Sequence, residues 1–148
     1  MSTLWVVGDS TLSPFNDKFY YPRYGYGTML NQYLDKTIEV KNLALSGRSS
    51  KSFLSEPEYV QLLGGMREGD YLLIGFGHND EKMEEQRHTA GKGGYMDEGS
   101  FANSLYVNYY LKAKEAGCTT ILCTPIVRRT PDGKWTSDML HITSDQDK

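Results

Sequence analysis

The chain has 148 residues, and its 39% hydrophobic and 12% aromatic content is enough for the packed core of one folded domain, which excludes disorder. Its 16 basic and 19 acidic residues are interspersed and leave a net charge of −3, so no basic stripe exists for binding nucleic acid. No apolar run reaches the roughly 18 residues of a membrane span. No leader pattern is visible either, so we expect no membrane partner and a cytoplasmic protein, or a secreted one whose signal has been removed.

The first predicted element is a buried strand at residues 4–7, where four apolar residues rich in β-branched types end at a Gly-Asp-Ser-Thr turn. This turn places Ser10 at the carboxyl end of the strand. Open parallel sheets bind ligands outside these strand ends, so Ser10 is a candidate nucleophile. The same turn also suits an ordinary helix cap in which Asp9 bonds the backbone. The turn alone leaves both interpretations open.

An aromatic loop and an amphipathic helix follow this turn. Residues 14–27 are dense in tyrosine, glycine and proline, which predicts a surface loop whose rings either form a platform for a sugar or act as half-buried lids. Residues 28–35 place four apolar side chains at helical spacing, which predicts a helix packed on a sheet.

The rest of the chain alternates strands and helices. We predict a strand at 38–45, a helix at 56–63 ended by Gly64 and Gly65, a strand at 70–77, a loop or insertion at 81–99, a helix at 101–116 capped by Ser100 and stopped by Gly117, and a strand at 119–124. This alternation is typical of a parallel α/β sheet with right-handed crossovers. Because the strand ends of such a sheet share one edge, we expect Ser10, Gly47 and Asn79 to converge there.

The two cysteines, Cys118 and Cys123, flank or lie within the strand predicted at 119–124. Five residues apart along an extended segment, they are too distant to form a disulfide easily, and two cysteines do not make a metal site. The sequence therefore predicts free thiols in a reducing compartment.

The groups at the three strand ends can carry out ester hydrolysis. Ser10 can supply the nucleophile. The backbone N–H groups of Ser10 and Gly47 and the amide of Asn79 can supply three hydrogen bonds to the oxyanion that forms. Each such donor is typically worth about 3–4 kcal/mol of the barrier.

Three motifs in this order carry a family resemblance. Gly-Asp-Ser-Thr at 8–11, Ala-Leu-Ser-Gly-Arg-Ser at 44–49 and Gly-His-Asn-Asp at 77–80 resemble the first three sequence blocks of the SGNH, or GDSL, hydrolases. The first and third are most similar to the rhamnogalacturonan acetylesterase branch, whose members remove acetyl groups from pectic polysaccharide. Pro-Ile-Val-Arg-Arg at 125–129 also resembles this branch.

The resemblance implies a three-layer, flavodoxin-like α/β fold with a parallel sheet and helices on both faces. It implies a single domain over residues 1–148 that lacks the last strand and helix at its carboxyl end. Ser10 is then the nucleophile, and Gly47 and Asn79 complete the oxyanion hole, with no cofactor and no metal. His78 is then local structure beside Asn79. The implied partner is an acetylated oligo- or polysaccharide.

The orienting carboxylate and the base are the open part of this resemblance. The family's Asp-x-x-His block is expected after a fifth strand, and Asp138 and His141 match its spacing without such a strand before them. Either His141 is the base and Asp138 orients it, or the base lies beyond Lys148 in a longer esterase. In the second case the fourth strand leaves an exposed sheet edge through which a homodimer can form.

Two functions from different classes remain. The first is a serine esterase that removes acetyl groups from O-acetylated, rhamnogalacturonan-type carbohydrate through an acyl-Ser10 intermediate. The second is a catalytically silent carbohydrate-binding or interaction module without a base. A nucleotide-binding domain, suggested by Gly75 and Gly77, lacks the third glycine and the lysine of a phosphate loop. Arg128 and Arg129 suit either uronate carboxylates or a solvated turn.

Overall fold

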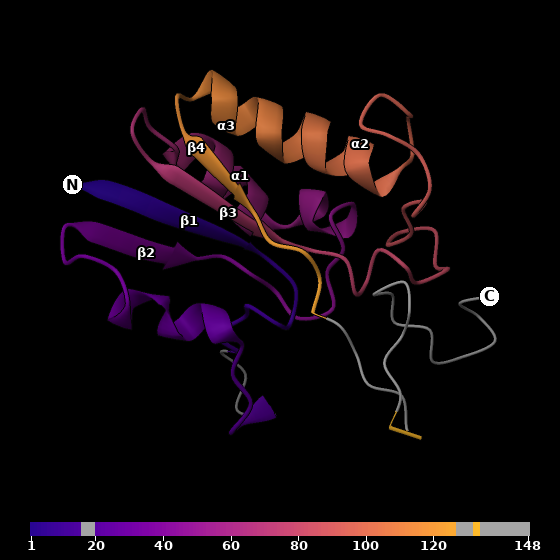
Figure 1. The fold of residues 1–148 in the computed structure, drawn as a ribbon, viewed down its shortest axis with the longest axis horizontal. Coiled ribbons are helices and arrows are strands. Elements are labelled where there is room, and N and C mark those ends of the chain that lie inside the picture. The colour runs from indigo at the N-terminus through magenta and orange to yellow at the C-terminus, as the bar shows by residue number, and fades with distance from the viewer. Residues whose placement is uncertain (16–19, 127–131, 134–148) are drawn as a thin grey trace.

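The computed structural model describes residues 1–15, 20–126 and 132–133. A parallel sheet lies at its centre and consists of β1 (Ser2–Gly8), β2 (Ile38–Asn42), β3 (Tyr71–Gly75) and β4 (Thr119–Leu122). The strand order is β2-β1-β3-β4, so the first strand is an inner one (Figure 1). The register pairs Leu4 with Val40 on one side and with Tyr71 on the other. The predicted parallel α/β architecture is confirmed.

One face of the sheet is covered by α1 (Pro57–Gly65) and by a long helix that runs without a break through α2 (Phe101–Leu105), the π-helical η4 (Tyr106–Tyr110) and α3 (Leu111–Glu115). In Figure 1, α2 and α3 lie along one side of the sheet. The core between these layers is built from large apolar side chains: Trp5, Val7, Leu43, Phe53, Leu62, Met66, Leu72, Ile74, Phe76, Leu105, Tyr109 and Ala113. Most of the buried apolar side chains therefore lie on this face.

The other face is packed by a 3₁₀ helix, η2 (Tyr26–Gln32), where an α-helix was expected at 28–35. This helix begins early because its first residues are fixed to the turn after β1. The backbone N–H of Tyr26 donates to the Thr11 carbonyl at 2.8 Å. A Cβ on Gly27 would lie 2.4 Å from the carbonyl oxygen of Leu12. This close approach sets where η2 begins.

The end of α1 corrects the expectation that Gly64 and Gly65 cap the helix. Both glycines lie inside α1, and the capping residue is Met66, whose N–H donates to the Leu62 carbonyl at 3.1 Å. Gly65 has a packing role instead, because a Cβ there would lie 2.3 Å from the ring of Trp5. The absence of a side chain, and not a positive φ, is what this position requires.

The remaining elements follow the predictions with shorter strands. The three later strands end at Asn42, Gly75 and Leu122, two residues or more before their predicted ends. The Ser100 side chain caps its helix by accepting a bond from the Asn103 N–H at 2.9 Å. Both cysteines are free. None of the helices in the described part of the chain has the length and apolarity that crossing a bilayer requires.

Candidate active site

The turn after β1 holds Ser10 at the carboxyl end of this strand. The carboxylate of Asp9, only 2% exposed, accepts hydrogen bonds from the backbone N–H of Thr11 at 2.9 Å and from its hydroxyl at 2.8 Å. The N–H of Asp9 donates to the Gly75 carbonyl on β3 at 3.4 Å. These bonds fix the turn, as expected for Asp9, and Ser10 remains partly exposed.

The loop after β2 presents the backbone of Gly47. This residue has a φ of +77°, in the left-handed region that favours glycine, and a Cβ here would meet no atom within 4 Å. The Leu45 N–H anchors the loop to β1 by donating to the Gly8 carbonyl at 3.0 Å. An ion pair between Arg48 and Glu56, at 2.9 Å, adds a second anchor. A side chain at Gly47 would therefore point into open space, and the loop that carries Gly47 is anchored at two points.

The loop after β3 brings Asn79 against the Gly47 loop. Asn79 is buried, and its Nδ2 donates to the Arg48 carbonyl at 3.2 Å. The structure thus brings Gly47 and Asn79 together, although 31 residues separate Arg48 from Asn79 in the sequence. Ser10 follows the strand that lies between theirs.

His78 belongs to the same loop and faces the segment after β4. It is 5% exposed, and its Nε2 forms a 2.7 Å hydrogen bond with the carbonyl of Ile126. Next to it, Gly77 packs so closely on Pro125 that a Cβ would lie 2.3 Å from the proline Cγ. These contacts fit the role expected for His78, which is local structure beside Asn79.

Three N–H groups at these strand ends have no acceptor among the described residues. Among the described residues, the backbone N–H groups of Ser10 and Gly47 donate no hydrogen bond. The Arg48 carbonyl takes one amide hydrogen of Asn79 and leaves the other. Donors of this kind can bind the oxygen of a developing oxyanion.

A buried polar cluster that the sequence did not reveal lies below these loops. The Asp80 carboxylate accepts hydrogen bonds from the Ser50 backbone N–H, the Ser50 hydroxyl and the Thr89 hydroxyl. The Ser50 hydroxyl also bonds that of Ser104, and the Tyr109 hydroxyl donates to the Ser50 carbonyl at 2.7 Å. Burial raises the pKa of Asp80, the bonds from Ser50 and Thr89 oppose the rise, and the charge of Asp9 adds to it. The cluster ties the Gly47 loop to the Asn79 loop from beneath.

Tyr26 of η2 contacts the end of β4. Burial raises the pKa of Tyr26 to about 12, and the neighbouring Cys123 thiol and Asp9 carboxylate raise it as well. Tyr26 is therefore a neutral hydroxyl at neutral pH, and it adds no charge beside Asp9.

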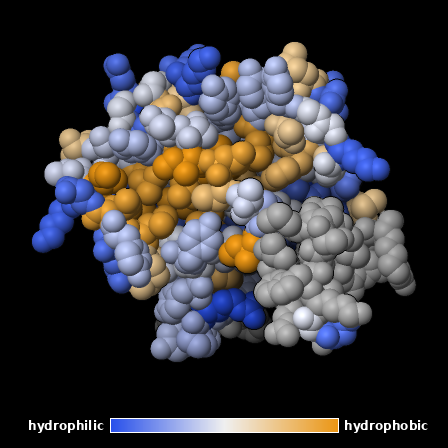
Figure 2. Space-filling view, viewed as in Figure 1, coloured by the Kyte–Doolittle hydropathy of each residue, from blue (hydrophilic) through white to orange (hydrophobic). Residues whose placement is uncertain are grey.

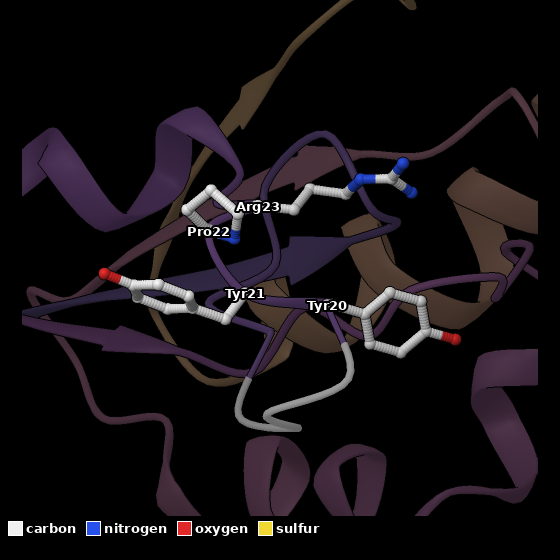
Figure 3. A pocket seen from close by; sticks show the side chains of 4 residues that line it. All are labelled: Tyr20, Tyr21, Pro22 and Arg23. Carbon is white, nitrogen blue, oxygen red and sulfur yellow. The ribbon is translucent and has the colours of Figure 1, made fainter.

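The aromatic loop forms a pocket of its own. Tyr20, Tyr21, Pro22 and Arg23 line a pocket of about 520 Å³, in which the two tyrosine rings point to opposite sides (Figure 3). Tyr21 is 75% exposed, so its ring is not a half-buried lid. A solvent-exposed ring can pack against the apolar face of a sugar.

Four residues singled out in the sequence, Arg128, Arg129, Asp138 and His141, lie outside the described residues.

Arg87 was not anticipated from the sequence, and it contacts two of the loops at the strand ends. Arg87 donates to the side-chain oxygen of Asn79 at 3.2 Å and to the Gly47 carbonyl at 3.4 Å. It lies in the polar segment 81–99, where no periodicity marks any residue for a role.

Known proteins related to this chain are esterases. No family model matches the chain. It is 32% identical over 127 residues to a probable rhamnogalacturonan acetylesterase, YesY, of Bacillus subtilis, a match that covers 84% of this chain and 54% of YesY. It is 37% identical over 81 residues to the rhamnogalacturonan acetylesterase RhgT of Bacillus subtilis, covering 53% of this chain and 34% of RhgT.

Solved structures agree with the fold. The structure of YxiM from Bacillus subtilis superposes with a TM-score of 0.65 at 29% identity, over 88% of this chain and 35% of that one. A possible lipase from Chitinophaga pinensis has a TM-score of 0.61 at 19% identity, over 87% of this chain and 50% of that one, and supports the fold alone. The chain spans about half the length of these relatives, or less. The resemblance to SGNH hydrolases and their rhamnogalacturonan acetylesterase branch is confirmed.

Proposed function

We propose that this chain, whose relatives are SGNH-type esterases, is a serine esterase that removes acetyl groups from O-acetylated carbohydrate of the rhamnogalacturonan type. The observation that carries the proposal is the set of unbonded donors at the strand ends. The N–H groups of Ser10 and Gly47 and one amide hydrogen of Asn79 have no protein acceptor among the described residues, and Ser10 itself is partly exposed.

The proposed reaction has two steps. The Oγ of Ser10 attacks the acetyl carbonyl carbon, a base takes the hydroxyl proton, and the three N–H donors hold the negative oxygen. The bond from that carbon to the sugar oxygen breaks, and the sugar oxygen receives the proton. Water then attacks acetyl-Ser10 with the help of the same base and releases acetate and free Ser10. The base is either His141 oriented by Asp138, or a residue beyond Lys148.

The proposed substrate contacts involve the aromatic loop. Exposed rings at Tyr20 and Tyr21 suit the apolar face of a sugar, and the guanidinium of Arg23 suits a uronate carboxylate. Arg128 and Arg129 are further candidates for that carboxylate. These contacts also support the second candidate function, a silent carbohydrate-binding module, because none of them requires Ser10 or a base.

Release of p-nitrophenol from its acetate ester tests the esterase proposal. We expect the purified chain to hydrolyse the ester and Ser10→Ala to lower the rate by about four to six orders of magnitude, down to the detection limit. Ser55→Ala, which removes an exposed serine hydroxyl outside the site, is the matched control and should keep the wild-type rate. A folded wild-type chain at background rate means that the base lies elsewhere, and leaves two interpretations, a part of a longer esterase or the silent module.

His141→Ala then identifies the base. Loss equal to that of Ser10→Ala assigns the base to His141, whereas a retained rate means that the base is another residue. Release of acetate from acetylated rhamnogalacturonan, compared with acetylated xylan, tests the class of carbohydrate. Equal rates on both polymers contradict the pectic assignment without affecting the esterase assignment.

A further inference from the structure

Arg87 contacts two of the three loops of the proposed site from outside them. Its Nη1 donates to the Asn79 side-chain oxygen at 3.2 Å and to the Gly47 carbonyl at 3.4 Å. The side chain of Arg87 is 28% exposed, so most of it is shielded from water. One guanidinium therefore joins the residues from which two proposed oxyanion donors come.

The contact with Asn79 fixes which way its carboxamide points. A guanidinium has only donors, so the atom facing Arg87 must be the amide oxygen. The amide NH₂ then points away from Arg87, and one of its hydrogens bonds the Arg48 carbonyl at 3.2 Å. A flipped amide would set NH₂ against the guanidinium and leave the Arg48 carbonyl without this donor. Asn79 therefore has one preferred orientation, in which its second hydrogen remains free.

Arg87 is itself held in place by Glu84. The Glu84 carboxylate bonds both Nε and Nη2 of Arg87, which leaves Nη1 to reach the site. The backbone N–H of Arg87 donates to the Glu84 carbonyl at 2.9 Å. A planar guanidinium with partners on three nitrogens has little freedom to rotate. The direction in which Nη1 points is therefore determined by the segment 81–99.

We propose that Arg87 is a positioning residue for this site, an inference that rests on the proposed function. It orients the carboxamide of Asn79 so that one amide hydrogen is free for the oxyanion, and it holds the Gly47 loop at a fixed place beside that amide. A hydrogen bond to the amide oxygen also strengthens the amide NH₂ as a donor. Arg87 touches no reacting atom and acts through Asn79 and Gly47.

Steady-state kinetics of four variants test this role: Arg87→Met, Arg87→Lys, Asn79→Ala and the double variant of Arg87→Met with Asn79→Ala. We expect Arg87→Met to lower kcat roughly tenfold to a hundredfold with KM within about twofold, because a misplaced donor weakens the transition state and not substrate binding. Arg87→Lys keeps a donor and should recover part of kcat. Arg67→Met, which removes an arginine that bonds the Gly64 and Met66 carbonyls at the end of α1, is the control and should keep both constants.

The double variant separates positioning from general support of the fold. If Arg87 acts through Asn79, its substitution causes little further loss once Asn79 is alanine. If the fold-loss of kcat in the double variant equals the product of the losses in the two single variants, the proposal is overturned. An unchanged kcat in Arg87→Met overturns it as well.

The side-chain amide signals of Asn79 in a nitrogen–proton NMR spectrum test the contact without any activity. These signals are identified by their absence in Asn79→Ala. We expect both amide proton shifts to move in Arg87→Met and to stay in Arg67→Met, and unmoved signals in Arg87→Met overturn the proposal. If the wild-type chain releases no p-nitrophenol, the kinetic test falls with its activity, while this spectrum still decides whether Arg87 orients Asn79.

Discussion

Asp70 and Asp80 stand at opposite ends of β3, and their pKa values shift in opposite directions. Burial alone raises the pKa of Asp70, but bonds from the Thr3 N–H at 2.8 Å, the Trp5 indole at 3.0 Å and the Arg67 N–H at 3.0 Å outweigh it and lower the pKa. At Asp80 burial prevails, so its pKa is raised. The two carboxylates therefore affect stability with opposite dependence on pH.

The sign follows from which state binds the proton more tightly. At Asp70 the unfolded chain binds the proton more tightly. The ionised Asp70 therefore stabilises the fold above the usual pKa of 3.8, and this effect is lost as pH falls through the lower pKa of the folded state. At Asp80 the folded chain binds the proton more tightly, so the unfolding free energy falls as pH rises from 3.8 through the raised pKa.

Urea unfolding between pH 2.5 and pH 7 tests this pair. We expect Asp70→Asn to lower the unfolding free energy at pH 7 by about 2–4 kcal/mol, because the amide NH₂ faces at least one of the three N–H donors whichever oxygen it replaces. The difference in unfolding free energy between Asp70→Asn and wild type should shrink below pH 4. The same difference for Asp80→Asn should instead be largest at the acid end of the range. A constant difference for Asp70→Asn across the range contradicts the assignment.

At the scale of single elements, the neighbouring glycines of α1 have different reasons for being glycine. A Cβ on Gly65 would meet the Trp5 ring at 2.3 Å, whereas a Cβ on Gly64 would meet nothing within 4 Å. Alanine favours a helix interior over glycine by about 0.5–1 kcal/mol, so packing alone decides the difference between the two sites.

Thermal and urea unfolding of the two alanine variants test this assignment. Gly64→Ala should stabilise the protein by about 0.5–1 kcal/mol. Gly65→Ala should destabilise it by about 1–3 kcal/mol, because the Trp5 ring must move. Equal effects of the two substitutions would show that Trp5 does not pack on α1 at Gly65.

The elements also show which parts of the fold are readable from sequence. Hydrophobic runs predicted all four strands and their order along the chain, because these signals are local. The strand ends were not predicted, because they depend on contacts between distant segments, such as the bond from the Asn42 side-chain amide to the Leu12 carbonyl, 30 residues away in the sequence. The glycine pair was misread for the same reason, because the Trp5 ring that Gly65 accommodates lies 60 residues earlier along the chain.

The candidate site also contains residues that the sequence marks and residues that it does not. Ser10, Gly47 and Asn79 were found because each stands in a short motif at the end of a predicted strand. Their roles remain predictions. Arg87 and Asp80 could not be assigned a role, because no pattern in the sequence connects them to Gly47 and Ser50, which lie 40 and 30 residues away.

At the scale of the whole molecule, β4 is an outer strand of the sheet that the described residues form. No described strand pairs with its outer edge, and Ile121 and Leu122 are 41% and 62% exposed. Figure 2 shows a band of apolar surface across the region where Figure 1 shows the strands. Unpaired backbone beside apolar side chains is a template for another strand. We expect a second copy of the chain to pair there.

Sedimentation velocity over a range of concentrations tests this pairing. The wild-type chain should show a concentration-dependent dimer, and Leu122→Lys should weaken it at least tenfold, because charges on an edge strand oppose pairing. Val60→Lys, at a site 69% exposed on α1, is the control and should associate like wild type. A wild-type chain that stays monomeric throughout contradicts the expected dimer.

The place of β1 inside the sheet affects how the chain folds as it is synthesised. β1 is translated before its neighbour β3, and the Thr3 N–H bonds Asp70 across 67 residues of sequence. At roughly 5–20 residues per second, β1 emerges from the ribosome several seconds before that partner exists. During this interval Leu4, Trp5, Val6 and Val7, all buried in the finished fold, have only part of their final surroundings. We therefore expect the nascent chain to be most open to aggregation before β3 has been translated.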